Sequence, residues 1–336
     1  MKKGKRLLVI TCLVGLGVFL VSLNDLAGAK DPDYPTKPIN LYIGFTAGGA
    51  TDLSTRAFCE AAGKYLGQPF VPINKTGGGG SLGAMAAMTA KPDGYTLYGG
   101  LGPSAACVVP LSKDAPYKDL SGFTLLVCFG TQSYPLIVRS DAPWKTWKEF
   151  IEWAKKNPKA AKVGLSGALS VDVKGLYLWR LAKQEQADLT FVAFKGTPEV
   201  VSAILGGHIT LYSVVADAST VPFLKEGKMR MLMYMGKEKI PGYENVPSAQ
   251  ELYGISTPAF VGVVGPKGLP GYVLEKLDDA FAKAAKDPQF ISTMERTSSP
   301  VLYMSRSDFS QYVNKTSLEV REIVKSFREE EAKKRH

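Results

Sequence analysis

Apolar residues occupy every second position from 39 to 45, which predicts a β-strand. Further on, the apolar residues of 53–65 recur at helical spacing, and Gly67 supplies a stop signal. The residues that join these two segments are Phe45, Thr46, Ala47, Gly48, Gly49, Ala50, Thr51 and Asp52. Two glycines suit a tight loop, and the last two side chains suit helix N-capping. The pattern therefore predicts a strand, a glycine loop and a helix.

Apolar strand segments and amphipathic helical segments alternate along the rest of the chain. The predicted strands cover residues 70–74, 95–98, 123–129, 134–138, 189–194, 209–215, 229–235 and 260–264. Helices are predicted between them; the capping box Thr146–Glu149 opens one, and Gly268 and Pro270 begin another. This spacing predicts an α/β protein with mostly parallel sheets.

Four loops rich in glycine or serine lie where a predicted strand passes into a helix, after Phe45, Asn74, Val163 and Phe194. The carboxyl ends of parallel strands meet at one edge of a sheet, so we expect these loops to line a single cleft. A glycine loop before a helix N-terminus exposes backbone N–H groups and the positive end of the helix dipole. The first loop is therefore either an anion-binding site or a tight turn with a cap.

The N-terminus has the pattern of an export signal. Basic residues at 2–6 precede an apolar run over 7–23, and Ala27-Gly28-Ala29 fits a cleavage site. The run is almost long enough to span a membrane, so an uncleaved anchor is the alternative. Cys12 lacks the small preceding residue of a lipoprotein signal. The leader holds four basic residues and one aspartate, so its removal lowers the formal net charge from +10 to +7.

Three cysteines, Cys59, Cys107 and Cys128, remain after cleavage, so at most one disulfide can form. They are either buried apolar thiols or include a Cys107–Cys128 bridge. The basic charge favours anionic solutes or an acidic membrane surface, although scattered exposed lysines explain it equally well. Basic residues do not alternate with aromatic ones, which argues against nucleic-acid binding.

Catalytic motifs are scarce. The sequence has no H-E-x-x-H, C-x-x-C or G-x-S-x-G motif, and we expect no metal and no cofactor. Residues 78–83 match G-x-G-x-x-G, but a run of four glycines produces this match easily, and Asp93 lies in a turn rather than at a strand end. His208 follows a glycine pair, as expected of a turn or strand-edge residue. A rigid cleft with anion-binding loops is what a transport receptor needs.

Ordered motifs along the whole mature chain resemble the Bug-type substrate-binding proteins of tripartite tricarboxylate transporters. In the first half these motifs are Tyr34-Pro35, the loop 45–52, Leu66-Gly67-Gln68-Pro69, Gly77 to Gly83 and Pro92-Asp93-Gly94-Tyr95-Thr96-Leu97. In the second half they are Phe194-Lys195-Gly196-Thr197-Pro198, Leu205-Gly206-Gly207, Asn245-Val246-Pro247-Ser248 and Pro266-Lys267-Gly268-Leu269-Pro270.

This resemblance implies a type II periplasmic binding fold with two lobes and a ligand in the cleft between them. Lobe 1 would comprise residues 32–137 and 261–336, lobe 2 residues 138–260, and 1–29 would be the signal peptide. The ligand-binding residues would be Phe45, Ala47, Gly48, Gly49, Ala50, Thr51, Asp52, Ser166, Gly167, Ala168, Ser170, Lys195, Gly196 and Thr197.

Two loops depart from the family pattern. The first usually reads P-G-G, and this chain has Ala47 before Gly48. The second usually reads G-S-A-G-N-G-S, and here Ala168 and Leu169 replace an asparagine and a glycine. The loss of polar contacts suggests a more apolar ligand, such as an aromatic or branched carboxylate.

The resemblance implies a non-enzymatic, monomeric periplasmic receptor. It would bind a small di-, tri- or aromatic carboxylate and deliver it to the membrane permease subunits of a transporter. One alternative is a periplasmic sensor that signals to a membrane partner. The other is an exported enzyme that uses Asp52 or Lys195 as an acid or base, which the shortage of paired titratable groups disfavours.

Overall fold

The computed structural model describes residues 33–213, 215–217, 219–297 and 299–334, and every structural statement below concerns these residues. The predicted leader at 1–29, with its apolar run and Cys12, lies outside them. Within the described ranges, no helix combines the length and the apolar character needed to cross a membrane. The elements named below all belong to one unit that begins at Pro35.

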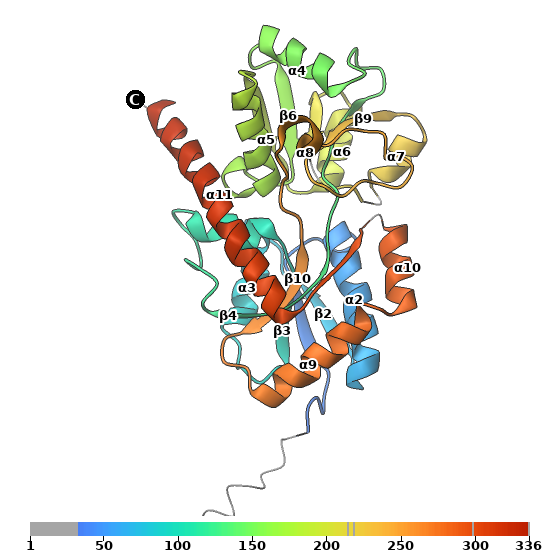
Figure 1. The fold of residues 1–336 in the computed structure, drawn as a ribbon, viewed down its shortest axis with the longest axis vertical. Helices are drawn as coiled ribbons and strands as arrows, with labels where there is room; N and C mark the ends of the chain where they lie inside the picture. The colour runs from blue at the N-terminus through green and yellow to red at the C-terminus, as the bar shows by residue number, and fades with distance from the viewer. Residues whose placement is uncertain (1–32, 214, 218, 298, 335–336) are drawn as a thin grey trace, which may run out of the picture. The chain divides into compact units, whose positions relative to one another are not determined.

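The first of two sheets has six strands in the spatial order β11-β4-β10-β3-β1-β2. Figure 1 labels β2, β3, β4 and β10 of this sheet. Its strands are β1 (Ile39–Ile43), β2 (Phe70–Asn74), β3 (Thr96–Leu101), β4 (Phe123–Gly130), β10 (Val261–Pro266) and β11 (Val301–Met304). Ile39, Leu41 and Ile43 are completely buried, whereas Asn40 is exposed. The alternation predicted for β1 is therefore confirmed.

The second sheet takes its strands from the middle of the chain, in the spatial order β7-β6-β8-β5-β9. Its strands are β5 (Pro135–Arg139), β6 (Ala161–Leu165), β7 (Leu189–Ala193), β8 (Leu211–Ser213) and β9 (Met229–Tyr234). The two sheets and their helices confirm the α/β class.

The expectation of mostly parallel sheets is wrong. Of the strand pairs in the described residues, four are parallel and five are antiparallel. The parallel pairs join β1 to β2 and β3, and β6 to β7 and β8. The antiparallel pairs join β5 to β8 and β9, β10 to β3 and β4, and β11 to β4. β5 and β10 are each reached from the other sheet, so neither follows a strand-helix-strand unit within its own sheet. Only such units impose the parallel direction.

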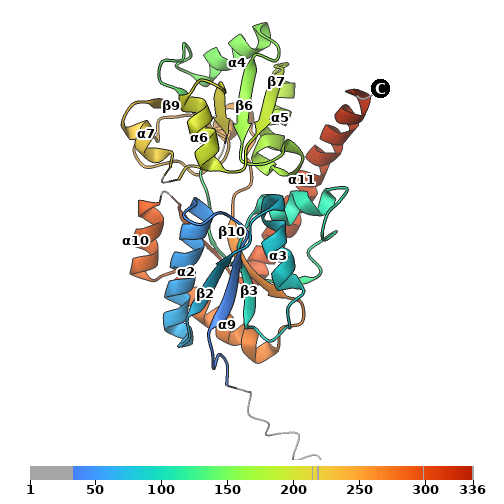
Figure 2. The same ribbon diagram turned by 180° about the vertical axis from the view of Figure 1, so that it is seen from behind.

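Helices accompany both sheets (Figure 2). Those of the first sheet are α2 (Ala50–Leu66), α3 (Ser81–Met88), α9 (Gly271–Ala284) and α10 (Pro288–Arg296). Those of the second are α4 (Trp147–Lys156), α5 (Val173–Gln184), α6 (Thr197–Leu205), α7 (Val221–Lys225) and α8 (Ala249–Tyr253). The short turns are η1 (Gly78–Gly80), η2 (Ser104–Val108), η3 (Val109–Leu111) and η4 (Leu169–Val171).

Aromatic packing fixes α2 against its surroundings. Phe58 is completely buried, and its ring stacks on Phe129 of β4 with centroids 4.5 Å apart. Phe281 of α9 and Phe290 of α10 pack on the same ring at 5.4 and 5.3 Å. Burial of one such side chain stabilises the fold by about 1.5–3 kcal/mol. The start of α2, where the first glycine loop ends, therefore rests on a rigid support.

Two neighbouring segments lead from one sheet to the other. Residues 131–134 join β4 to β5, and residues 254–260 lead into β10. Thr131 Oγ1 donates to the Ala259 carbonyl at 3.2 Å. The amides of Met235 and Thr257 donate to the carbonyls of Tyr134 and Met235, each at 2.8 Å. Hydrogen bonds therefore hold the two crossing segments side by side.

The C-terminal helix α11 (Arg306–Lys334) contacts elements of both sheets. Its first half packs on β4 and η2, and its second half lies beside α5 (Figure 1). There, Phe327 meets Trp179 edge-to-face at 5.3 Å, and Glu330 pairs with Lys183 at 2.7 Å. This helix is a further physical connection between the two halves of the molecule.

Candidate functional site

The first glycine loop connects β1 to α2 and is partly open to solvent. Thr46, Ala47 and Gly48 are exposed, Phe45 and Gly49 are half-buried, and Ala50 is buried. Gly48 has φ +81°, a backbone angle that side chains of L-residues rarely adopt, and its position has open space around it. The loop therefore needs glycine at 48 for its conformation, and this glycine is accessible.

The prediction that Thr51 and Asp52 cap α2 is wrong. Gly49 is the N-cap residue and offers no side chain, while Thr51 and Asp52 lie in the first turn of the helix. The Asp52 carboxylate instead accepts a hydrogen bond from the Gly48 amide at 2.9 Å. The two glycines bring the chain into the helix two or three residues earlier than the side-chain chemistry suggested.

Thr51 faces the segment that crosses between the sheets. Its Oγ1 accepts a hydrogen bond from Gln132 Nε2 at 2.9 Å. A Cβ at Gly100, near the end of β3, would lie 2.7 Å from Thr51 Cγ2. The start of α2 is therefore in contact with both the end of β3 and the crossing segment.

The run of four glycines forms a turn beside the first loop. Gly77, Gly78, Gly79 and Gly80 all have positive φ, between 57° and 129°. A Cβ on Gly80 would lie 3.3 Å from the Phe45 ring, and one on Gly79 would lie 3.8 Å from the Val171 carbonyl oxygen. The weak dinucleotide-type match is thus a left-handed turn that lies between the first loop and the η4 turn.

The second predicted loop leaves β6 and leads into α5. Ser166 and Gly167 are half-buried, and Ala168 and Ser170 are exposed. Gly167 has φ +141° and nothing within 4 Å of its Cβ position. Asp172 ends the loop by accepting a hydrogen bond from the Gly175 amide at 3.0 Å, which caps α5.

A buried lysine follows this loop, and nothing in its sequence context distinguishes it. Lys174 is 7% exposed, pairs with Asp172 at 2.9 Å, and lies over the ring of Tyr134 at 5.7 Å. Burial, and then the charge of Asp172, raises the pKa of Tyr134 above its usual value, so this phenol is neutral. A lysine in the first turn of a helix resembles a solvated residue, and only the fold reveals its burial.

The third predicted segment, Lys195 to Thr197, leads from β7 into α6. Lys195 is exposed, and its amide donates to Glu199 Oε2 at 3.0 Å; Gly196 is the N-cap residue of α6. Because Leu165 of β6 pairs with Ala193 of β7 in a parallel register, this segment and the second loop leave the same edge of the second sheet.

The first sheet shows the same arrangement. Ile43 pairs in parallel with Asn74 of β2 and with Gly99 of β3. The first loop, the glycine turn and the end of β3 therefore emerge at one edge, as expected for carboxyl ends of parallel strands. Two features link this edge to the second loop. The Val173 amide donates to Ser104 Oγ at 3.2 Å, and Gly79 lies close to the Val171 carbonyl. The described contacts do not join residues 195–197 to the first loop in this way.

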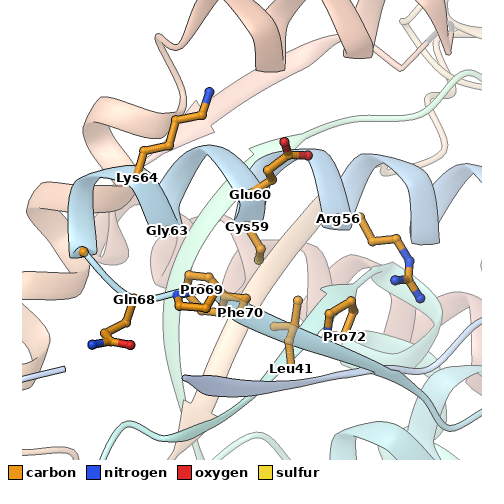
Figure 3. A pocket seen from close by; sticks show the side chains of 11 residues that line it. Leu41, Arg56, Cys59, Glu60, Gly63, Lys64, Gln68, Pro69, Phe70 and Pro72 are labelled. Carbon is orange, nitrogen blue, oxygen red and sulfur yellow. The ribbon is translucent and has the colours of Figure 1, made fainter. Parts of the chain in front are cut away.

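A separate groove of about 670 Å³ lies between α2 and the strands β1 and β2 (Figure 3). Its walls are Leu41, Arg56, Cys59, Glu60, Gly63, Lys64, Gly67, Gln68, Pro69, Phe70 and Pro72. None of the predicted ligand-binding residues lines it. In Figure 3, Lys64 and Glu60 point away from β2, and Lys64 bonds to Asp287 and Gln289 of α10. The groove is therefore separate from the predicted binding loops. The Lys64 ammonium beside it is already bonded to Asp287 and Gln289.

His208 and the three cysteines are the other groups that the sequence analysis considered for chemistry. His208 is exposed in the turn between α6 and β8. Cys59, Cys107 and Cys128 are free and buried, so the described structure contains no Cys107–Cys128 bridge. Burial raises the pKa of Cys107 to about 11 and that of Cys128 to about 12. In the described ranges, no three His, Cys, Asp or Glu residues gather as metal ligands would.

The molecule has two β-sheets flanked by helices, a pair of segments that cross between them, and glycine loops at the strand ends. This arrangement defines the class of two-sheet periplasmic binding proteins. The family model described as "Tripartite tricarboxylate transporter family receptor" matches residues 55–328. The chain belongs to this family, and the resemblance inferred from the sequence is confirmed.

Two relatives and one solved structure illustrate the similarity. A UPF0065 protein in the gbd 5′ region of Cupriavidus necator is 31% identical over 299 residues, which is 89% of this chain and 90% of the relative. Protein BugT of Bordetella pertussis is 27% identical and covers 76% of this chain and 78% of its own. MatC from Rhodopseudomonas palustris with bound malate is 25% identical, with a TM-score of 0.76, and covers 87% of this chain and 100% of its own.

Proposed function

We propose that this chain is the periplasmic receptor that binds a small organic carboxylate and delivers it to the membrane permease of a tripartite tricarboxylate-type transporter. Membership of the receptor family carries this proposal, and a family of receptors favours binding without turnover. The malate in the MatC structure is the chemical precedent for the ligand class. An export signal at 1–29, cleaved to release a monomer, agrees with this role.

We propose that the ligand lies between the first loop and the second loop. The close approach of Gly79 to the Val171 carbonyl and the hydrogen bond from Val173 to Ser104 support this position because they bring the two strand-end edges together. Backbone amides near Gly48 and Gly167 and the hydroxyls of Ser166 and Ser170 would supply the donors. A charge-assisted hydrogen bond contributes roughly 1.5–3 kcal/mol, so four or five could sustain micromolar affinity, about 8 kcal/mol.

The two lobes in this proposal are residues 32–137 with 261–336, and residues 138–260. Sheet membership supports the division for every strand except β5, because β1–β4, β10 and β11 form one sheet and β5–β9 the other, and the boundary at 137 falls inside β5. The boundaries at 137 and 261 fall at β5 and β10, next to the hydrogen-bonded segments described above. Paired crossing strands are suited to a hinge that closes when the ligand contacts both lobes.

A thermal-shift screen followed by calorimetry tests the function. Malate, adipate, succinate, citrate and benzoate are each added to the mature protein, and a ligand that binds only the folded state raises Tm. At a concentration of 100 Kd, binding stabilises the folded state by about 2.7 kcal/mol. We expect at least one acid to raise Tm and to bind with micromolar Kd or better, and none to be chemically converted. No binding across the panel would contradict the receptor function.

The same panel tests the more apolar ligand inferred from Ala168 and Leu169. If that inference is correct, benzoate binds more tightly than succinate and citrate. Much tighter binding of citrate or succinate than of any aromatic acid would rule it out, while leaving the receptor function intact.

A further inference from the structure

A buried carboxylate holds the first glycine loop in place from within the protein. Asp52 is only 1% exposed, and its Oδ2 accepts the Gly48 amide at 2.9 Å. Its Oδ1 accepts Asn74 Nδ2 at 2.8 Å, and the same Asn74 nitrogen donates to the Phe45 carbonyl at 2.9 Å. Asn74, at the end of β2, thus connects Phe45, at the beginning of the loop, to the Asp52 carboxylate. That carboxylate in turn holds Gly48, in the middle of the loop.

Arg56, one turn further along α2, completes this arrangement. Its Nε donates to Asp52 Oδ1 at 2.8 Å, and its Nη2 donates to Asn74 Oδ1 at 2.8 Å. Hydrogen bonds to charged groups are about twice as strong as those between neutral groups. Arg56 therefore fixes the orientation of both partners, and it places a positive charge against the carboxylate.

The charge of Asp52 matters for an anionic ligand. A buried carboxylate repels a second carboxylate that approaches within a few ångströms, unless a cation compensates it. Asp52 also occupies the Gly48 amide, so this donor is already bound to a protein carboxylate rather than directed at solvent.

We infer that Asp52, Asn74 and Arg56 are positioning residues: together they set the conformation of residues 45–50 and keep this loop electrically neutral, so that its other backbone donors can bind a carboxylate. These three residues, which we call the loop clamp, act through the loop and do not touch the ligand. The part concerning ligand affinity rests on the proposed function, whereas the part concerning loop conformation does not.

Hydrogen exchange in the protein without added ligand tests the conformational part. In Asp52→Ala, we expect amide exchange in residues 45–50 to accelerate by about tenfold or more, because the bond to a charged group is lost. Asp287→Ala is the matched control, since Asp287 is also a buried aspartate that accepts a backbone amide and is bonded to a basic residue of α2. Its loss should leave residues 45–50 unchanged. Wild-type exchange of this loop in folded Asp52→Ala and in Arg56→Gln would overturn the inference.

Calorimetry with malate and adipate tests the electrostatic part. We expect Arg56→Gln to weaken binding by about tenfold or more and Arg56→Lys to weaken it less, because lysine keeps the charge. Asp52→Asn added to Arg56→Gln should restore much of the affinity, because the loop is neutral again. A merely structural role, or direct ligand contact by Arg56, predicts no such rescue, so an unrescued double variant would overturn this part.

The two failures can be told apart. If the wild-type protein binds neither acid, nor any other acid of the panel, the proposed function fails, and hydrogen exchange alone decides whether the loop clamp exists. If the wild type binds and the folded clamp variants bind equally well, the inference fails and the function stands.

Discussion

Gly48 shows how one backbone angle can determine the properties of a binding loop. Its φ of +81° lies in the left-handed region, and an added Cβ would meet nothing within 4 Å. A side chain there would be disfavoured by the backbone angle, by roughly 1–2 kcal/mol, and not by crowding. It would project into the open space in which we place the ligand.

Gly48→Val is therefore expected to abolish carboxylate binding while the protein stays folded. Gly227→Val is the matched control, because Gly227 has φ +68°, equally open surroundings, and a place in the turn before β9. Calorimetry with the acid identified by the panel, together with Tm, distinguishes the effects. The two variants should lose similar stability, but only Gly48→Val should lose affinity. Equal affinity in both would show that the ligand binds elsewhere.

At the scale of elements, α2 carries the first loop and is held by the aromatic cluster around Phe58. The Phe58 ring contacts β4, α9 and α10 through Phe129, Phe281 and Phe290. The other end of the helix is fixed by Gly67, a left-handed C-cap with φ +72°. The helix is therefore secured along its length, which gives the loop a defined starting point.

Phe58→Ala is expected to lower the free energy of unfolding by about 3–5 kcal/mol, as for other large-to-small changes in well-packed cores. Glu60→Ala, an exposed change on the same helix, is expected to stay within about 0.5 kcal/mol of wild type. Urea denaturation measures both. A loss below about 1 kcal/mol for Phe58→Ala would mean that the cluster does not anchor α2.

Asp287 at the start of α10 predicts a pH dependence. Burial acts to raise its pKa, but the amides of Phe290 and Gln289 and the Lys64 ammonium outweigh it, so the pKa lies below 3.8. A depressed folded-state pKa contributes stability that is present above the unfolded pKa and is lost as pH falls through the folded pKa. Asp287→Asn should therefore destabilise the protein near pH 7, and the difference from wild type should shrink below pH 3.8 in urea titrations. A constant difference would contradict this assignment.

Most of the elements were predictable because their signals are local. The alternation in β1, the strand β2 and the stop at Gly67 all depend on neighbouring residues, and the structure confirms them. The antiparallel pairing of β10 with β3 and β4 was not predictable, since β10 follows β4 by more than a hundred residues. Strand direction in such a pair depends on where the chain re-enters the sheet, which local patterns do not encode.

The candidate site was predictable only in part, for a similar reason. Glycine-rich segments indicate loops, so Gly48 and Gly167 could be selected from the sequence. Both glycines have positive φ in the structure. Asn74 and Arg56 reach Asp52 from a neighbouring strand and from the next helical turn, and nothing in their own sequence context distinguishes them from solvated polar residues. The ligand-binding set itself remains a prediction.

At the scale of the whole molecule, α11 links parts that belong to different sheets. It packs on β4 and η2, and then on α5 through the Trp179–Phe327 and Lys183–Glu330 contacts. The ion pair is partly exposed and contributes at most about 1 kcal/mol, so Phe327, which is 9% exposed, carries most of the coupling. Such a link favours unfolding of both halves in one transition.

Phe327→Ala is expected to separate that transition into two. All four tryptophans lie at positions 144–179, within the predicted second lobe, so tryptophan fluorescence reports on this part alone. Circular dichroism at far-ultraviolet wavelengths reports on the helices of both parts. The two midpoints should coincide in the wild type and in Lys183→Ala, and they should diverge in Phe327→Ala. Coincident midpoints in Phe327→Ala would show that α11 does not couple the halves.

The position of the bound acid tests the central claim most directly. A crystal structure of the mature protein with the tightest-binding acid of the panel should place a carboxylate within hydrogen-bond distance of backbone amides in both residues 45–51 and residues 166–170. The loop clamp should remain intact beneath it, with Asp52 still bonded to the Gly48 amide. An acid bound in the groove between α2 and β2, or far from both Gly48 and Ser170, would contradict the account.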